Sequence, residues 1–465
     1  MKNMTLTQIA NACHGQLIGD PCSDREVTGV VLDSRKIEKD SLFIATVGER
    51  VDGHSFIDEV FEKGAMAVLC ERAPVSCVGP YILVQNSFDA LKEIARWYRM
   101  QLDIKVVGIT GSVGKTSTKE FISCVLSQKY QVLKTEGNFN NEIGLPLTIL
   151  KIRGHHEVAV LEMGISNFGE MHRLSNIAQP DICVITNIGQ CHLENLGSRE
   201  GILKAKSEIF DFMKENGYVC INGDDDMLAT IQEVKGRRPV KFGIGSGNEV
   251  SATDIQSHGL FGSSCRIHVN HSSFPAEVPL PGSHMVLNAL AATAVGTILS
   301  MSDAEIAAGI QSVRPVGGRS NILRRDSWTI IDDCYNANPV SMKAALDLLK
   351  MADTRKVALL GDMGELGVDE KELHGEVGAY AATSGVDLLV CTGALSLHMY
   401  ERAKKQLKEA QQQPASPAAV TQLLYFTTRD ELIKALPSFL QDQDTILVKA
   451  SHFMGFENVV QALLS

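Results

Sequence analysis

The sequence predicts an α/β protein with three domains, and three observations lead to this prediction. The chain has 465 residues, which is too long for one ordinary domain. From residue 103 onward, strand-like apolar runs alternate with helical runs, a pattern typical of a parallel sheet with helices on both faces. A second alternating block follows the segment VRPVGG at 313–318, where proline and glycine interrupt the pattern.

We therefore expect three domains with different architectures. Residues 1–102 should form a small α/β domain, in which short strand-like runs surround one helix over residues 88–100. Residues 103–314 should form a central domain around a parallel sheet, and residues 315–465 a smaller Rossmann-like domain.

Three further segments carry local predictions. Residues 258–278 read as a β-hairpin, and residues 282–300 as a buried helix rich in alanine. Residues 404–419 are rich in Lys and Gln and then in Pro, so we expect a solvated helix end followed by a loop.

Composition limits the classes of function. The formal net charge of −11 disfavours a nucleic-acid partner, because there is no basic excess to displace the counterions of a phosphate backbone. The N-terminus lacks the apolar core of a signal peptide, and no stretch is apolar enough for a membrane span. Eleven cysteines without a C-x-x-C pair suggest reduced thiols, so we expect a cytoplasmic protein, which we take to be a monomer. Cys183, Cys191 and His192 have the wrong number and spacing for a zinc site.

The strongest motif is a glycine-rich phosphate-binding loop. The string GITGSVGKT at 108–116 follows a predicted strand and opens a predicted helix, which is the context that such a loop needs. Backbone N–H groups would converge on the phosphates of ATP, Lys115 would reach the β- and γ-phosphates, and the Thr116 hydroxyl would ligate Mg²⁺. The usual spacing places the first glycine at position 109, but this sequence has Ile109 there and glycine at 108 and 111. The residues expected to bind ATP here are Gly111, Ser112, Val113, Gly114, Lys115, Thr116 and Ser117.

Three residues beyond this loop carry possible chemistry. Glu162 ends a predicted strand on the side where ligands bind in such sheets, so it is a candidate Mg²⁺ ligand or a solvated strand end. His192 follows the next strand, and on its own it would more often be an ordinary packed or surface histidine. Lys206 on the next helix would ordinarily be an exposed charge.

Taken together, these residues resemble the Mur ligase family. The family has the T-G-x-x-G-K-[TS] loop found at 110–116, a magnesium-binding Glu, a His after a T-N-[IL] strand, and a carbamylated Lys in an A-K-x-E-I helix. Glu162, the string TNI at 186–188 with His192, and the string AKSEI at 205–209 match in the same order. The resemblance implies ATP and two Mg²⁺ ions as cofactors, with Thr116, Glu162, His192 and a carbamylated Lys206 around the metals.

Four further stretches resemble the family member that adds D-alanyl-D-alanine (D-Ala-D-Ala) to UDP-N-acetylmuramoyl-tripeptide. They are Asp33–Arg35 with 43–54, the Asn-rich segment 135–146, DDCYNANP at 332–339 and GDMGELG at 361–367. This resemblance implies an ATP-dependent ligase with these two compounds as partners. The ligase that adds the preceding residue fits less well, because its D-N-P-R motif is missing, and a non-ligase switch ATPase would need only the phosphate loop.

The resemblance also assigns the remaining candidate residues. Asn288 would contact adenine, Tyr335 and Asn336 would bring the third domain onto the nucleotide, and Asn141 would lie near the reacting centre. Arg319 would reach phosphate, or would be a solvated linker residue. The UDP-muramoyl peptide would contact Asp33, Ser34, Arg35, Arg50, His54, Asn138 and Asn140, although Asp33 also suits a turn cap and His54 a packed loop. One departure is KASH at 449–452, where the family often has K-G-S-[RK], so no permanent cation is assigned to His452.

Overall fold

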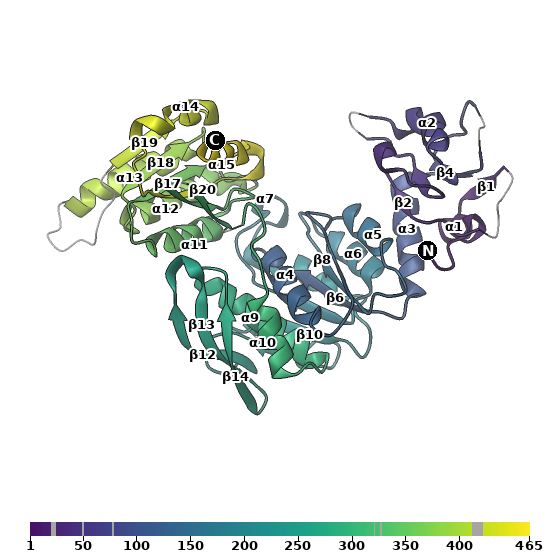
Figure 1. Cartoon of the computed structure of the whole chain (residues 1–465), viewed down its shortest axis with the longest axis horizontal. Coiled ribbons are helices and arrows are strands. Elements are labelled where there is room, and N and C mark those ends of the chain that lie inside the picture. The colour runs from purple at the N-terminus through teal and green to yellow at the C-terminus, as the bar shows by residue number, and fades with distance from the viewer. Residues whose placement is uncertain (20–24, 49–50, 77–78, 320, 326–327, 412–421) are drawn as a thin grey trace.

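The computed structural model describes residues 1–19, 25–48, 51–76, 79–319, 321–325, 328–411 and 422–465. Three sheets follow one another along an elongated molecule, with the N-terminal region at one end and the C-terminal region at the other (Figure 1). The predicted α/β class with three sheet-containing regions is confirmed. The boundaries at 102/103 and 314/315 remain predictions.

The N-terminal sheet has five strands in the order β1-β5-β4-β3-β2. Its strands are β1 (Gln16–Ile18), β2 (Val30–Val31), β3 (Leu42–Ile44), β4 (Ala67–Cys70) and β5 (Tyr81–Leu83), and its helices are α1 (Leu6–Ala12), α2 (Ile57–Glu62) and α3 (Ser87–Met100). The helix expected at 88–100 is α3, which begins where the Asn86 side chain accepts a hydrogen bond from the Asp89 N–H group. The sequence analysis did not find α1 and α2, which have seven and six residues.

Helix α3 ties the N-terminal region to the central one. Arg99 is 2% exposed and donates from Nε to the Ala178 carbonyl at 2.9 Å. The neighbouring Tyr98 hydroxyl donates to the Ile152 carbonyl at 2.7 Å. One buried apolar cluster continues from α1 and α3 into the helices on one face of the central sheet. The two regions therefore share a core.

The central sheet has nine strands in the order β14-β13-β12-β11-β10-β9-β6-β8-β7. The strands are β6 (Lys105–Thr110), β7 (Val132–Lys134), β8 (Val158–Glu162), β9 (Ile182–Ile185), β10 (Tyr218–Asn222), β11 (Val240–Phe242), β12 (Val250–Ser257), β13 (Ser263–Val269) and β14 (Ser272–Val278). Strands β6 to β12 pair in parallel, whereas β12, β13 and β14 pair antiparallel. The hairpin expected at 258–278 is β13 and β14, preceded by a turn.

Helices cover both faces of the central sheet. Side chains of α5 (Gly144–Ile149), α6 (Glu170–Ala178) and α8 (Arg199–Ser207) belong to the buried cluster on one face. Side chains of α4 (Lys115–Leu126), α9 (Ser283–Ile298) and α10 (Asp303–Gln311) belong to the cluster on the other face. The short helix α7 (Leu193–Leu196) lies between β9 and α8. The helix expected at 282–300 is α9.

The C-terminal sheet has six strands in the order β15-β16-β20-β17-β18-β19. The strands are β15 (Asn321–Arg325), β16 (Trp328–Asp332), β17 (Lys356–Gly361), β18 (Leu388–Thr392), β19 (Gln422–Phe426) and β20 (Thr445–Lys449). The helices are α11 (Pro339–Lys350), α12 (Glu370–Thr383), α13 (Ser396–Gln411), α14 (Arg429–Phe439) and α15 (Glu457–Leu464). Strands β16 to β20 are parallel and two separate buried clusters cover the sheet, as in a doubly wound domain.

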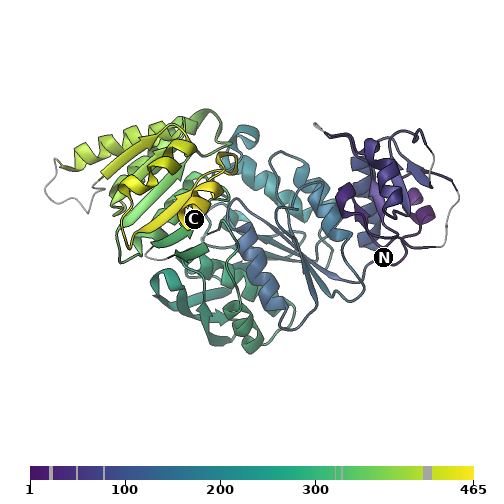
Figure 2. The ribbon, with the colours of Figure 1, turned by 45° about the horizontal axis from the view of Figure 1, so that its top comes forward.

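The C-terminal region lies beside the central one (Figure 2), and side chains of the central region pack against its core. The turn between β12 and β13 places Leu260 against the C-terminal cluster, and the Arg324 guanidinium lies 5.0 Å from the centre of the Phe261 ring. Of the segment expected as helix end and loop at 404–419, residues up to 411 belong to α13, and the rest lies outside the described residues. Across the described helices, none has the length and hydropathy needed to span a membrane.

Candidate active site

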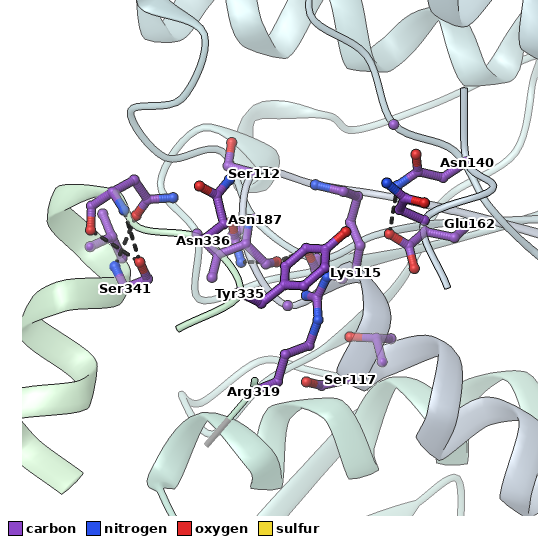
Figure 3. A pocket seen from close by; sticks show the side chains of 18 of the residues that line it. Ser112, Lys115, Ser117, Asn140, Glu162, Asn187, Arg319, Tyr335, Asn336 and Ser341 are labelled. Atoms are coloured by element: carbon purple, nitrogen blue, oxygen red, sulfur yellow. Dashed lines mark hydrogen bonds between the residues drawn. The ribbon is translucent and has the colours of Figure 1, made fainter. Parts of the chain in front are cut away.

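A cavity of about 880 Å³ lies where the central and C-terminal regions meet. Its walls come from the phosphate loop, the Asn-rich segment, the ends of β8 and β9, the start of α9, and the start of α11. Figure 3 shows Tyr335 and Arg319 from the C-terminal side facing Lys115 and Ser117 of the loop. The cavity therefore brings together groups from segments about 200 residues apart in the chain.

Two glycines give the phosphate loop its shape. Gly111 has a φ of +150°, and a Cβ atom there would lie 1.9 Å from Thr186 Oγ1. Gly114 has a φ of +81° and stands directly before α4. Both positions need glycine, because a side chain at 111 would collide with β9 and a residue at 114 must be left-handed. The loop glycine displaced from the usual spacing is thus fixed by packing against Thr186.

Two residues that follow β9, Thr186 and Asn187, support the phosphate loop through hydrogen bonds. The Thr186 hydroxyl donates to the Val113 carbonyl at 2.6 Å, and the Val113 N–H group donates to Asn187 Oδ1 at 2.9 Å. The Asn187 side chain also donates back to the Val113 carbonyl at 2.9 Å. The sequence analysis used Thr186 and Asn187 as motif positions and did not identify this support. Lys115 Nζ also donates to the Gly111 carbonyl at 2.8 Å and so closes the loop on itself.

Glu162 is the acidic centre of the cavity. It is the last residue of β8 and is 1% exposed. The Thr116 hydroxyl donates to its Oε2 at 2.8 Å, and Asn140 Nδ2 donates to its Oε1 at 2.9 Å (Figure 3). Lys119, which the sequence analysis overlooked, is 2% exposed with its Nζ 3.8 Å from Oε2. Because α4 begins beside the end of β8, each of its first five residues either contacts the Glu162 carboxylate or lines the cavity.

Lys206 lies on α8 close to Cys191 and Lys115, and His192 lies directly before α7. Lys206 is 1% exposed, and burial lowers the pKa of its ammonium from 10.5 to about 8. Within the described part of the chain, no carboxylate lies within ion-pair distance of its Nζ. His192 lines the cavity, and its Nδ1 lies 2.7 Å from Glu365 Oε2 across the interface between the regions. This contact with His192 lowers the pKa of the Glu365 carboxyl.

The remaining central candidates line the same cavity. Asn288 accepts a hydrogen bond from the Thr118 hydroxyl at 2.8 Å. Asn141 accepts from the Gly144 N–H group at 2.9 Å and so caps the start of α5, while Asn138 lines the wall beside it. The described chain has no group of three or more His, Cys, Asp or Glu side chains arranged to hold a metal ion by themselves.

The C-terminal wall carries the Tyr335 ring, the guanidinium of Arg319 beside that ring, and the buried cation Lys449. The Arg319 guanidinium lies 4.1 Å from the centre of the Tyr335 ring, and the His452 ring lies 5.8 Å from that ring. Lys449 is 2% exposed and donates to Asp333 Oδ2 at 2.6 Å and to the Asn336 carbonyl at 2.9 Å. This ion pair fixes the loop that carries Tyr335, and the sequence analysis did not assign it.

Among the described residues, the N-terminal candidates Asp33, Ser34, Arg35 and His54 do not line the cavity. Asp33 caps a turn, with its carboxylate on both the backbone and the guanidinium of Arg35, which holds the pKa of Asp33 well below its usual range. Ser34 lies in the same turn. His54 is nearly buried: its Nδ1 lies 2.7 Å from Asp52 Oδ1, and its Nε2 accepts from the Glu71 N–H group at 2.9 Å. Arg50 lies outside the described residues.

Family models match most of the chain. The Mur ligase middle domain matches residues 109–296, the Mur ligase glutamate ligase domain matches residues 318–452, and the Mur ligase catalytic domain matches residues 26–105. The UDP-N-acetylmuramoyl-tripeptide–D-alanyl-D-alanine ligase of Bacillus subtilis is 38% identical over 469 residues, which cover 100% of this chain and 99% of that protein. The chain belongs to the Mur ligase family. The Escherichia coli enzyme of the same name is 35% identical over 100% of this Mur ligase and 99% of its own length.

Solved structures agree with this assignment. A crystal structure of MurF from Acinetobacter baumannii has a TM-score of 0.88 and 32% identity, covering 99% of this Mur ligase and 98% of that chain. MurF from Thermotoga maritima, solved in complex with ADP, has a TM-score of 0.79 and 31% identity, covering 94% and 97% of the two chains. The likeness therefore extends over all three sheets.

Proposed function

We propose that this Mur ligase uses ATP to join D-Ala-D-Ala to UDP-N-acetylmuramoyl-tripeptide in the cytoplasm, as a monomer that acts in peptidoglycan precursor synthesis. The observation that carries the proposal is the shared cavity, in which the phosphate loop faces polar groups of the C-terminal region. The names of its full-length relatives indicate the same pair of substrates. We also propose that residues 1–102, 103–314 and 315–465 are the three domains.

The ATP site is proposed to combine both walls of the cavity. Lys115 would exchange its bond with the Gly111 carbonyl for the β- and γ-phosphate oxygens, and the backbone N–H groups of the loop would hold the phosphates. Asn288 beside α4, and Tyr335 and Asn336 from the C-terminal side, would enclose the base and sugar, since all three line the cavity. The Arg319 guanidinium, already held flat on Tyr335, would reach phosphate from the C-terminal side.

The residues around Glu162 fit a magnesium site. Mg²⁺ prefers oxygen ligands and is usually bound through one or two carboxylates plus substrate phosphates and water, so a large protein cluster is not required. Glu162 and Thr116 supply two such oxygens within 2.8 Å of each other at the phosphate loop, and His192 lines the same wall. When bound, the metal would supply charge neutralisation between the phosphates and the attacking carboxylate.

Lys206 fits the carbamate that the family resemblance implies. A neutral amine is needed to add to carbon dioxide, and burial makes the neutral form accessible near pH 8 by lowering the pKa. The ammonium first loses one proton, and addition of the neutral amine nitrogen to carbon dioxide then releases a second proton and leaves a carbamate anion. That change would convert an unpaired buried cation into an anionic ligand for a second Mg²⁺ ion.

The reaction would then proceed in two balanced steps. A carboxylate oxygen of the tripeptide attacks the γ-phosphorus of ATP, so that the acyl phosphate forms and ADP leaves. The neutral amine of D-Ala-D-Ala attacks the acyl carbon, phosphate leaves, and the nitrogen releases one proton. Lys115 and Arg319 would stabilise the charge that develops on phosphoryl oxygens, and Asn138, Asn140 and Asn141 would orient the peptide.

The muramoyl nucleotide is proposed to reach this cavity from the N-terminal domain. Asp33, Ser34, Arg35, Arg50 and His54 stay as candidates for the UDP group, and Arg35 is an exposed cation of that turn whose guanidinium pairs with Asp33. Because α3 joins this domain to the central core, the domain is held at a fixed place relative to the phosphate loop. The tripeptide would span the distance between the two sites.

Phosphate release tests the proposed function. Purified protein with Mg²⁺ and ATP should release phosphate at a sustained rate when both UDP-N-acetylmuramoyl-tripeptide and D-Ala-D-Ala are present. Release that needs a dipeptide precursor and a free amino acid would instead identify the preceding-step ligase. Release without any acceptor would identify a switch or motor ATPase and contradict the proposal.

A further inference from the structure

Lys119 is a buried lysine that the proposed reaction does not use. It lies one turn after Lys115 on α4 and is 2% exposed. Its Nζ is 3.2 Å from Glu120 Oε1 and 3.8 Å from Glu162 Oε2. A lysine is seldom buried to this degree unless a carboxylate pairs with it, and Lys119 lies between two carboxylates.

Glu162 has one full positive charge beside it in the part of the chain that the structure describes. Its two closest donors, the Thr116 hydroxyl and the Asn140 amide, are neutral. Lys119 provides the charge that balances this carboxylate in a nearly water-free site. If Glu162 binds Mg²⁺ as proposed, metal and lysine must share the same carboxylate.

Glu120 is the second carboxylate that attracts Lys119. Its carboxylate is 14% exposed and contacts both Lys119 and Lys134, and Lys134 is 42% exposed. The four side chains thus form a row of alternating charge that runs from the surface to the cavity: Lys134, Glu120, Lys119 and Glu162. The attraction of Glu120 for Lys119 opposes a full pairing of Lys119 with Glu162.

We propose that Lys119 is the internal counter-cation of Glu162 and that it weakens metal binding by competing with Mg²⁺ for this carboxylate. The inference rests on the proposed role of Glu162 as a metal ligand. Lys119 acts through Glu162 and is therefore a positioning residue. A buried cation close to the metal repels it, because Coulomb interactions are strong where water is excluded. The row of charges then lets metal leave with the products.

Direct measurement of metal binding tests this inference. Free Mn²⁺ would be counted by its electron paramagnetic resonance signal at fixed protein and ADP concentrations, with the full-length protein. We expect Lys119→Met to bind Mn²⁺ about tenfold more tightly than the wild type. Glu120→Gln should bind it several-fold more weakly, and this effect should shrink in the Lys119→Met background, because the two changes act through one ion pair.

Two comparisons separate the possible failures. Lys134→Met serves as the matched control: it removes an exposed cation from the same carboxylate and should change Mn²⁺ affinity less than twofold. Glu162→Gln should abolish the tight site, and an unchanged affinity there would refute the proposed metal ligand itself. If Glu162→Gln weakens binding while Lys119→Met does not tighten it, Lys119 has a packing role and the inference is wrong. If Lys119→Met does not fold, the Glu120→Gln variant decides the question. A Mn²⁺ affinity of Glu120→Gln equal to that of the wild type would then overturn the inference.

Discussion

Replacing Lys206 by methionine should stabilise the protein at neutral pH. Burial lowers the pKa of Lys206 from 10.5 to about 8, so the folded state resists protonation of this amine. Since each pKa unit corresponds to about 1.4 kcal/mol, the protonated lysine costs the folded state about 3 kcal/mol. Methionine has a similar length and no charge, so Lys206→Met removes this cost and retains most of the packing.

The pH dependence gives the sign of the effect. Below about pH 8, Lys206 is protonated in both the folded and unfolded states, and the whole cost is present. Between pH 8 and 10.5 the unfolded chain binds more protons at this site, so the free energy of unfolding gains a contribution that rises with pH. The advantage of Lys206→Met should therefore be about 3 kcal/mol at pH 7 and should fade towards pH 10.5.

Urea unfolding at several pH values measures this difference. The buffers would be depleted of carbon dioxide and contain EDTA, so that neither carbamate nor metal contributes. Lys204→Met, an exposed lysine on the same helix α8, is the matched control and should change the free energy of unfolding by less than about 0.5 kcal/mol. A Lys206→Met protein that is less stable than the wild type at pH 7, or a difference that does not change with pH, would refute the reasoning.

Three further predictions concern activity and domain motion. Lys115→Ala should abolish ligation while circular dichroism stays that of the wild type, because this lysine bonds only the Gly111 carbonyl in the described structure; wild-type turnover would remove it from the mechanism. Lys206→Ala should be inactive and partly rescued by short carboxylates that replace the carbamate, and activity without rescue would contradict that role. Small-angle scattering should show compaction when ATP analogue and both substrates bind, since the site is divided between two domains; an unchanged radius of gyration would count against closure.

Local signals made the central part of the molecule predictable. The phosphate loop was found because strand, glycines, lysine and helix follow one another within a dozen residues, and its geometry follows from them. Glu162 and His192 both line the cavity, because parallel strands end at a common edge, and their roles as metal ligands remain predictions. The sequence predicted the hairpin of β13 and β14 but not the antiparallel pairing of β12 with β13. The residues of a strand do not show which strand it pairs with.

Long-range contacts explain what the sequence could not supply. Lys119 looks like an exposed helical lysine in the sequence, and its burial depends on β7 and β8 packing over α4. The Lys449–Asp333 ion pair joins residues 116 positions apart, so no local sequence pattern predicts it. At the N-terminal domain, the structure gives Asp33 and His54 the local roles of turn cap and packed residue, so their proposed contact with UDP needs a ligand to test it.

The fate of one oxygen atom tests the central claim most directly. The tripeptide would be labelled with ¹⁸O in its reacting carboxylate and incubated with ATP, Mg²⁺ and D-Ala-D-Ala. If the carboxylate is activated as an acyl phosphate, each phosphate released carries one ¹⁸O atom, and the mass of the peptide product corresponds to addition of the dipeptide. Unlabelled phosphate accompanied by the ligated product would contradict that intermediate, and labelled phosphate that requires no dipeptide would contradict the assigned acceptor.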